Sequence, residues 1–362
     1  MKINTIIIWI ILILLLSSIF PITSSINLDS QDLITVDDDG GADYTRIQDA
    51  IDNASDRDTV FVFNGVYYES LVIDKMINLS GEDKYLTIID GNKLNDVIYV
   101  NYSYVRINHF TIRNSGNKDL PEMDSGIQLD TVNYCSMVDN ILINNNNGIY
   151  IYNSSFNMIV DNINKNNDNA LSVDGFCDFN LNIIFESSFN YFCNNIITDN
   201  RNGITFGYTK NSIICNNTIS NNSNSGIYLF NSKYHTIINN TIMNCSDGIY
   251  IEESSKNIVQ NNHLTGNEKG VFCSYAPENN FKYNNFILNE DNAKFTKFFH
   301  QGFLIPNKWN NNYWDDWIEL GGKIIPGIMY IPNDNLIGLF VPWIEVDWRP
   351  LREPYDILFQ RV

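Results

Sequence analysis

The sequence has 362 residues and carries 42 acidic against 23 basic side chains, for a formal net charge of −19. This acidity argues against a nucleic-acid groove, which needs a basic stripe to displace the counterions of the phosphate backbone. It is typical of a protein that must stay soluble outside a cell. Weak binding of divalent cations such as Ca²⁺ is the alternative interpretation, and no other cofactor is indicated.

Residues 1–25 have the features of a secretory signal. Lys2 supplies a small positive start, and Ile6–Leu16 is an unbroken apolar run. Small residues at Thr23 and Ser25 then suit a cleavage site. An uncleaved membrane anchor is the alternative, because apolar residues continue to Ile22. We expect a secreted or cell-surface protein whose contact with a membrane is confined to this segment.

Residues 33–58 are predicted to form a strand followed by a capping helix. Ile47, Ala50, Ile51 and Ala54 follow the spacing i, i+3, i+4, i+7 of a short amphipathic helix. Such a helix can lie over the first coil of a repeat and cover a strand edge that would otherwise template aggregation.

A repeat of about 22 residues decides the fold class. Units that begin at Gly126, Gly148, Ala170, Gly203, Gly226, Gly248 and Gly270 start 22, 22, 33, 23, 22 and 22 positions apart. Each unit holds three short, alternately apolar strands between Asn, Ser and Gly corners. Strands this short pair with the equivalent strands of the next coil, about 4.8 Å along the axis. The sequence therefore predicts an all-β, right-handed, single-stranded parallel β-helix.

The β-helix is predicted to cover residues 59–292, with Asn side chains that ladder from coil to coil at the corners. Residues 293–362 hold five of the six Trp and many Pro, which is typical of an irregular cap folded against the last coil. Cys193 and Cys215 lie 22 residues apart, in adjacent coils. A disulfide between them is left open, because neighbouring parallel strands offer strained geometry.

Several segments resemble known β-helix families. Val36–Ile51 and Asn64–Ile73 resemble the opening of pectin-methylesterase-like proteins. The Asn-x-Ile and Gly-Ile-Tyr repeats, with Asn311–Trp317, are more similar to the NosD-like group of carbohydrate-binding-and-sugar-hydrolase (CASH) β-helices. This resemblance spans nearly the whole mature chain. It implies an exported surface protein of the archaeal type, associated with carbohydrate binding or sugar hydrolysis.

The sequence departs from the catalytic members of these groups. The Gln-Asp-Thr and Asp-Phe-Ile-Phe-Gly signatures of the esterases are missing, as are polygalacturonase-type and pectate-lyase-type motifs. The NosD group is tied to copper-site maturation, but copper requires clustered His, Met or Cys. His109, His235, His263 and His300 are scattered. We therefore predict no metal site.

One strand face is the predicted binding surface. In strands of the Gly-Ile-Tyr-Ile type the Ile side chains point inward, so the residues that alternate with them point outward. Aromatic rings can stack on sugar faces while neighbouring carboxylates accept hydroxyl hydrogen bonds, although aromatic residues also simply suit exposed strands. The predicted substrate-binding residues are Tyr99, Gln128, Tyr150, Tyr152, Tyr228, Phe230, Tyr250 and Phe272.

Two insertions, at residues 116–124 and 174–184, are expected to wall this face. Asp130 and Asp174 fall between them, two coils and so about 9.6 Å apart. This separation is near the upper end of the range of about 6.5–9.5 Å in inverting glycosidases. The two aspartates are therefore the candidate catalytic acid–base pair.

We expect a monomeric, non-catalytic protein that binds an extracellular polysaccharide or a cell-surface glycan, and that has no nucleic-acid partner. Two alternatives remain open. One is a polysaccharide-active hydrolase or lyase that uses carboxylates in the loop-walled cleft, and the other is a NosD-like copper-maturation factor.

Overall fold

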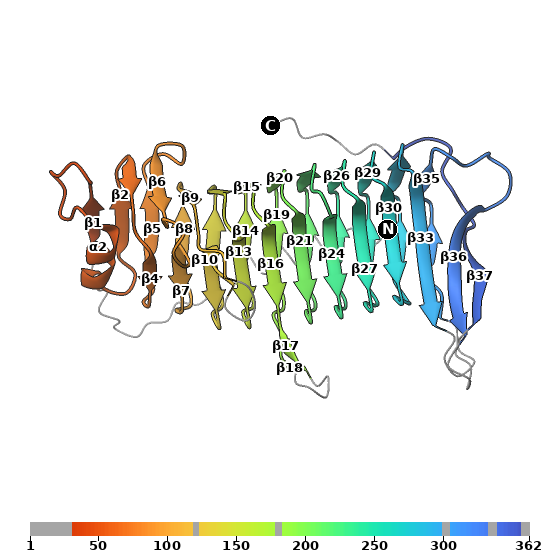
Figure 1. The fold of residues 1–362 in the computed structure, drawn as a ribbon, viewed down its shortest axis with the longest axis horizontal. Helices are drawn as coiled ribbons and strands as arrows, with labels where there is room; N and C mark the ends of the chain where they lie inside the picture. Colours follow the sequence, from red (N-terminus) through yellow and green to blue (C-terminus); the bar gives the residue numbers. More distant parts are fainter. Residues whose placement is uncertain (1–30, 119–122, 178–182, 299–304, 332–338, 356–362) are drawn as a thin grey trace, which may run out of the picture. The chain divides into compact units, whose positions relative to one another are not determined.

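Short strands wind into a right-handed parallel β-helix in the computed structural model of the protein (Figure 1). The structure describes residues 31–118, 123–177, 183–298, 305–331 and 339–355. The predicted signal, residues 1–25, lies outside these ranges. No helix in the described ranges is long and apolar enough to cross a membrane.

Each coil contributes one strand to each of three series. The long-strand series comprises β4 (Leu71–Ile73), β7 (Ile98–Val100), β10 (Ser125–Asp130), β13 (Asn147–Tyr152), β16 (Asn169–Asp174), β21 (Asn202–Gly207), β24 (Ser225–Phe230), β27 (Asp247–Glu252), β30 (Lys269–Ser274), β33 (Asp291–Phe298) and β36 (Lys323–Ile331). The second series comprises β1 (Leu33–Val36), β2 (Thr59–Val62), β5 (Asn78–Gly81), β8 (Arg106–Asn108), β11 (Ser136–Val138), β14 (Met158–Val160), β19 (Tyr191–Cys193), β22 (Ile213–Cys215), β25 (Thr236–Ile238), β28 (Ile258–Gln260), β31 (Asn280–Lys282) and β34 (Lys308–Asn310). The third series comprises β3 (Gly65–Tyr67), β6 (Thr87–Asp90), β9 (Thr111–Arg113), β12 (Ile141–Ile143), β15 (Ile163–Lys165), β20 (Ile196–Thr198), β23 (Thr218–Ser220), β26 (Thr241–Met243), β29 (His263–Thr265), β32 (Asn285–Ile287) and β35 (Tyr313–Trp314).

The strand register follows the sequence period. Ile127 pairs with Ile149, and Ile149 with Leu171, in parallel strands of successive coils. The inward positions therefore stack Ile, Leu and Val in columns that are buried along the solenoid. The burial of these columns removes apolar surface from water and is the main stabilising contribution to the fold. The predicted three-strand coil is confirmed.

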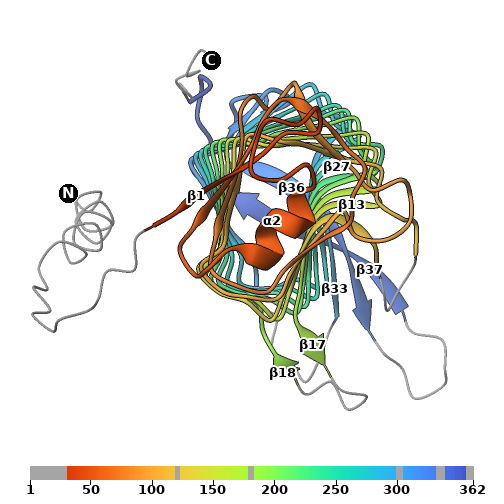
Figure 2. The same ribbon diagram turned by 90° about the vertical axis from the view of Figure 1, so that its left-hand side faces the viewer.

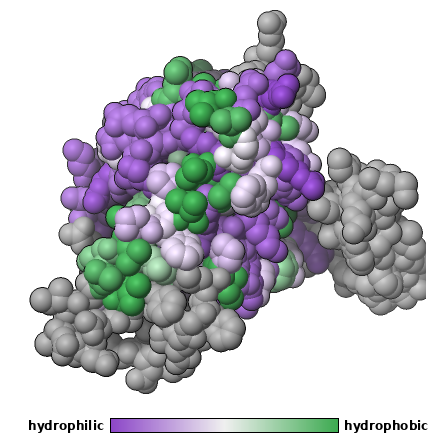
Figure 3. All heavy atoms as spheres, turned by 90° about the vertical axis from the view of Figure 1, so that its right-hand side faces the viewer, coloured by the Kyte–Doolittle hydropathy of each residue, from purple (hydrophilic) through white to green (hydrophobic). Residues whose placement is uncertain are grey.

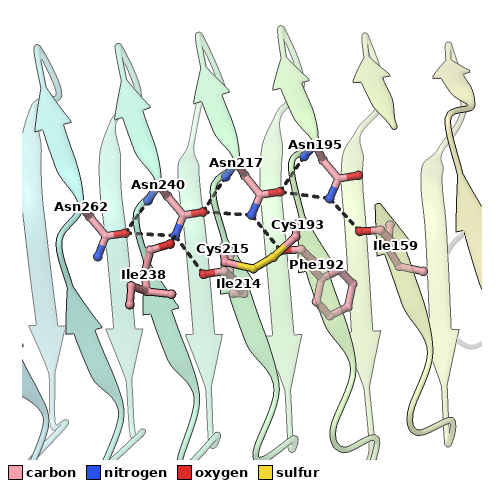
Figure 4. Close-up of a disulfide and its surroundings, with 10 residues drawn as sticks. All are labelled: Ile159, Phe192, Cys193, Asn195, Ile214, Cys215, Asn217, Ile238, Asn240 and Asn262. Atoms are coloured by element: carbon pink, nitrogen blue, oxygen red, sulfur yellow. Dashed lines mark hydrogen bonds between the residues drawn. A yellow bond between two sulfur atoms is a disulfide. The ribbon is translucent and has the colours of Figure 1, made fainter. Parts of the chain in front are cut away.

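At the corners, neighbouring Asn residues have two different roles: one takes the left-handed backbone of the turn, and the next forms hydrogen bonds between coils. Asn216 takes a left-handed backbone with φ of 53°, a conformation that Asn tolerates better than most residues. The next residue, Asn217, is buried, and both its backbone N–H and its Nδ2 donate to Asn240 Oδ1, at 2.9 Å each. Figure 4 shows this pattern repeating from coil to coil. The central Asn ladder comprises Asn140, Asn162, Asn195, Asn217, Asn240, Asn262, Asn284 and Asn312.

Cysteines contribute one covalent link between coils. Cys193 and Cys215 pair in β19 and β22 and form a disulfide, with Cα atoms 4.7 Å apart (Figure 4). The sequence had left this bridge open. Cys135, Cys245 and Cys273 are buried free thiols, and Cys273 takes an inward strand position opposite Ile251.

The N-terminal end is closed by helix α2 (Ile47–Asn53), which lies across the first coils (Figure 2). Its apolar residues Ile47, Ala50 and Ile51 are buried. The Glu69 carboxylate accepts hydrogen bonds from the backbone N–H groups of Ile47 and Gln48, at 2.8 and 3.1 Å. A distant carboxylate thus satisfies donors that the helix itself leaves unpaired.

The C-terminal end is more regular than the sequence suggested. Coil stacking continues beyond Asn292, because Trp309 and Trp314 take inward positions and stack on Phe281 and Phe286, at centroid distances of 4.0 and 4.2 Å. Strand β37 (Leu339–Asp347) then pairs antiparallel with β36. Figure 3 shows this end of the solenoid, where apolar side chains interrupt a polar surface.

Candidate functional site

The two sequence insertions lie at opposite ends of the long strands. Residues 116–124 precede β10, and their described part includes Lys118 and Asp124. The second insertion directly follows β16 as an antiparallel hairpin of β17 (Phe176–Cys177) and β18 (Ile183–Phe185). This hairpin projects beyond the coils (Figure 2). The outward face of the long strands between the insertions is the candidate site.

The strand register brings the predicted residues into two outward columns. The first column contains Tyr99, Gln128, Tyr150, Ser172, Thr205, Tyr228, Tyr250 and Phe272 in successive coils. The second column, two residues further along each strand, contains Asp130, Tyr152, Asp174, Gly207, Phe230 and Glu252.

A tyrosine–carboxylate pair recurs between these columns. Tyr99 Oη donates to Asp130 Oδ2 at 2.7 Å. Tyr150 bonds to Asp174 in the same way, and Tyr228 Oη donates to Glu252 Oε2. Each tyrosine thus reaches the carboxylate one coil on and two residues along. We call these three pairs the Tyr–carboxylate pairs.

Burial and hydrogen bonding shift the protonation of these groups. Burial raises the pKa of Asp174 to about 6, against a smaller opposing effect of the Tyr150 hydroxyl. Burial and the acceptor role of Asp130 raise the pKa of Tyr99 to about 12. The tyrosine hydroxyls therefore remain protonated donors at neutral pH.

Asp96 is a site residue that the sequence reasoning missed. It lies just before β7, and its Oδ1 accepts the backbone N–H of Ser125 at 2.6 Å. The side-chain amide of Gln128, oriented to donate, lies 3.1 Å from Asp96 Oδ2. Burial, with the nearby charges of Asp124 and Asp130, raises the pKa of Asp96 to about 7. No motif marks this position, since it belongs to an early coil where the repeat has drifted.

Three aromatic rings of the first column, in successive coils, cover one another. Tyr228 stacks on Tyr250 and Tyr250 on Phe272, with centroids 5.0 and 5.2 Å apart and interplanar angles of 23° and 18°. Lys269 Nζ lies 5.2 Å from the Phe272 ring centroid. Tyr150 is only 6% exposed. At Tyr228 and Tyr250, ring edges and hydroxyls rather than ring faces therefore lie at the surface.

Asp130 and Asp174 lie two coils apart, as predicted, with Tyr152 at the position between them. Burial raises the pKa of Tyr152, and both carboxylates raise it further. On the far side of Asp174, a Cβ at Gly207 would lie 2.5 Å from Asp174 Oδ1. The absence of a side chain at Gly207 therefore makes the space that this carboxylate occupies. The catalytic role of the two aspartates remains a prediction.

A second aromatic column also escaped the sequence reasoning. Tyr104, Tyr134, Phe156 and Phe189 follow the long strands at one corner, with ring centroids 5.1 Å apart. They are 44–57% exposed. All four take positive φ, between 57° and 65°, which is unfavourable for bulky residues. The recurrence of Ser-Ser-Phe-Asn at Phe156 and Phe189 was the available signal.

The described residues do not offer a soft metal site. Both ring nitrogens of buried His235 are engaged, by Thr209 Oγ1 and by the backbone N–H of Ser212. His109 lies 3.6 Å from Asp139, away from the other described histidines in sequence and strand. Within the described ranges, the only cluster of His, Cys, Asp or Glu able to surround an ion is Asp37–Asp39. Its carboxylate oxygens suit hard ions rather than copper.

Solved structures share this fold at low sequence identity. The A-module of the mannuronan C-5 epimerase AlgE4 from Azotobacter vinelandii is 16% identical, with a TM-score of 0.51 over 72% of this chain and 90% of that one. XylC in complex with xylose is 11% identical, with a TM-score of 0.56 over 71% and 70%. A DFA-IIIase from Arthrobacter chlorophenolicus is 12% identical, with a TM-score of 0.51 over 84% and 86%. No curated protein matches this chain significantly in sequence.

A family model gives the more specific assignment. The model described as periplasmic copper-binding protein (NosD) matches residues 51–183 and 178–321. These ranges together span well over half of the chain and include every coil of the candidate site. The chain therefore belongs to the NosD family of periplasmic β-helix proteins.

Proposed function

We propose that this chain is a secreted or cell-surface carbohydrate-binding protein without catalytic activity, and that the outward face of its long strands binds a glycan. The Tyr–carboxylate pairs carry the proposal. They place the same set of polar atoms on the same face in several coils, as an extended polymer with repeated sugar units requires.

The covered ring faces define how a sugar would bind. Carboxylate oxygens of Asp130, Asp174 and Glu252 accept hydrogen bonds from sugar hydroxyls, and the exposed ring edges contact sugar C–H groups. The insertion before β10 and the β17–β18 hairpin after β16 limit the ligand at either end of the strands. One fold neighbour, XylC in complex with xylose, is consistent with this use of the fold.

The test is calorimetric binding of a polysaccharide panel to the full chain. We expect the double variant Asp130→Asn, Asp174→Asn to bind at least about tenfold more weakly. The matched control is Asp161→Asn, Asp199→Asn, which removes the same charge at corners with φ of 58°. Asn adopts this backbone at the equivalent corners of later coils, Asn216 for Asp161 and Asn221 for Asp199, with φ of 53° and 55°. Equal binding by the wild type and both variants would refute the assigned face.

A polysaccharide-active enzyme is the second candidate, and one observation favours it. Asp96 and Asp174 have pKa values raised to about 7 and about 6, which suits a general acid at neutral pH. Incubation with the same panel, followed by product analysis, separates the two functions. Turnover that is lost in Asp174→Asn would support the enzyme and overturn the non-catalytic proposal.

Copper delivery, which the family description suggests, does not fit the donors in the described residues. Copper sites combine His, Cys and Met at short range, and the three free described thiols are buried in separate coils. Titration with copper under reducing and oxidising conditions tests this reading, and submicromolar binding would contradict it.

A further inference from the structure

We infer that the long-strand face prefers glycans with amino groups over neutral glycans, and that it excludes uronate-rich and sulfated polysaccharides. The inference rests on the proposed glycan binding and adds the charge class of the ligand. It follows from which charges on this face are balanced and which are not.

The carboxylates of the Tyr–carboxylate pairs have no basic partner in the described part of the chain. No ion pair there joins Asp130, Asp174 or Glu252 to a lysine or an arginine. Their partners are hydroxyls: Asp130, for example, accepts from Tyr99 Oη and from Thr131 Oγ1. A hydroxyl satisfies one lone pair of a carboxylate but does not neutralise its charge as a lysine or an arginine would. Asp174, whose pKa burial raises to about 6, is charged only in part at pH 6, so the charge variants that test this inference use Asp130 and Glu252.

The lysines that border the face are already engaged by other acids. Lys118 Nζ lies 3.8 Å from Asp124, and Lys269 Nζ lies 2.9 Å from Asp247. Lys294 Nζ forms an ion pair with Asp291. A bound anionic sugar would therefore compete with resident carboxylates for every one of these three cations.

The charge of each class of glycan then determines the expected order of affinity. Proteins bind sugar carboxylates and sulfates through arginine or lysine, and a uronate beside Asp130 would instead face a like charge. The net charge of −19 adds long-range repulsion. A protonated amino sugar brings three N–H donors and a positive charge to the same oxygens. A neutral sugar brings only hydroxyl donors and ranks between the two.

The experiment compares three charge classes by calorimetry on the full chain at about pH 6. The panel contains chitosan oligomers, neutral cello-, xylo- and manno-oligosaccharides, and oligogalacturonate with heparan sulfate. EDTA is present throughout, so that no divalent cation bridges two carboxylates. We expect chitosan to bind most tightly and anionic glycans at least about tenfold more weakly than the best neutral one. High salt should narrow the gap between chitosan and the neutral glycans.

Matched charge variants separate the face from the general acidity of the protein. Asp130→Asn with Glu252→Gln should weaken chitosan binding by about tenfold or more, and Asp161→Asn with Asp199→Asn should leave it unchanged. Equal losses in both double variants would overturn the inference, because the attraction would then come from net charge alone. Anionic glycans that bind as tightly as neutral ones would also overturn it while leaving the proposed function standing. Failure of all three classes to bind would refute the proposed function itself.

Discussion

Replacement of Asp347 tests how the C-terminal end of the solenoid is closed. The central Asn ladder ends at Asn312, whose backbone N–H and Nδ2 donate to Asp347 Oδ2 at 3.0 and 2.9 Å. Trp314 Nε1 donates to the same oxygen at 3.2 Å. Asp347 is 0% exposed. Its other oxygen, Oδ1, accepts the backbone N–H of Arg349 at 3.0 Å. Truncation to Ala therefore removes the acceptor of four N–H groups.

The size of the effect follows from these donors. Each buried donor that loses its partner costs about 1–3 kcal/mol, and relaxation of the cap recovers part of the sum. We expect Asp347→Ala to lower the free energy of unfolding of the C-terminal coils by about 4 kcal/mol. Asp347→Asn keeps a carbonyl oxygen for Asn312 and Trp314, but it loses the charge assistance and turns an NH2 group toward the Arg349 N–H that Oδ1 accepts, so its cost should be about 2–3 kcal/mol.

Urea denaturation followed by circular dichroism gives the overall stability. Hydrogen exchange of the last coils locates the loss, because a repeat protein can open locally from one end. The control is Glu319→Ala, an exposed acid in the same region whose ion-pair partner is Arg352, at 3.8 Å. It should change stability by less than about 0.5 kcal/mol. Equal effects of Asp347→Ala and Glu319→Ala would refute the role of the buried carboxylate.

Three further outcomes follow from single residues. Asn164 is buried in the core column of the third strand series, and neither polar atom of its side chain forms a hydrogen bond. Asn164→Leu should therefore increase the free energy of unfolding by about 1–2 kcal/mol and raise the thermal midpoint. A lowered midpoint would contradict this expectation. Gly203→Ala places a Cβ 2.2 Å from the backbone oxygen of Gly226 and should destabilise the protein by about 2–4 kcal/mol in urea denaturation. A variant as stable as the wild type would contradict this prediction, because it would show that neighbouring coils can move apart to make room for the added methyl group. The pKa of Asp96 is raised to about 7 in the folded protein. Between about pH 4 and pH 7 the folded protein therefore keeps a proton on Asp96 that the unfolded chain has lost, and the free energy of unfolding falls as the pH rises through this range. Asp96→Asn should therefore gain stability relative to the wild type on going from about pH 4.5 to about pH 7.5, and parallel thermal-midpoint curves would contradict the shift.

The fold could be predicted because one short period controls several physical requirements at once. A step of 22 residues keeps Ile149 beneath Ile127, puts Gly148 where its strand passes closest to Ala170 of the next coil, and returns an Asn to each ladder. Neighbouring coils impose these requirements on every unit, so the sequence repeats them visibly. The C-terminal coil was harder to predict, because Trp309 and Trp314 replace Phe in the core columns and the spacing changes.

The sequence predicted which residues form the columns of the candidate site, but it did not predict how their side chains contact one another. Alternation along a strand fixes which residues point outward, and the register bears this out for Tyr99 and Gln128. The tilt of a ring is not fixed by alternation. Tyr228 and Tyr250 turn their faces toward each other because equivalent rings stand one coil apart, close to stacking distance. The sequence therefore suggested open ring faces where the structure presents edges.

The sequence did not predict the corner column of Tyr104, Tyr134, Phe156 and Phe189, for a different reason. Local propensity disfavours a large side chain at positive φ, so these rings were not expected at a corner. Stacking of four rings at 5.1 Å is a gain that no single coil shows. The favourable ring stacking arises between coils, whereas the unfavourable positive φ arises within each coil.

The Asn ladders also give the solenoid a direction, which explains the acids at one end. Each backbone N–H in a ladder donates to the side-chain oxygen one coil further on, so every step points the same way. At the N-terminal end the leftover group is an oxygen, and Asn140 Oδ1 accepts the backbone N–H of Phe110 at 3.1 Å. At the C-terminal end the leftover groups are N–H donors, which need an acceptor. Asp347 and Glu345 supply it for two neighbouring ladders from alternate positions of β37. Asp347 lies 35 residues beyond the last ladder residue, Asn312, so no repeat unit could have revealed it.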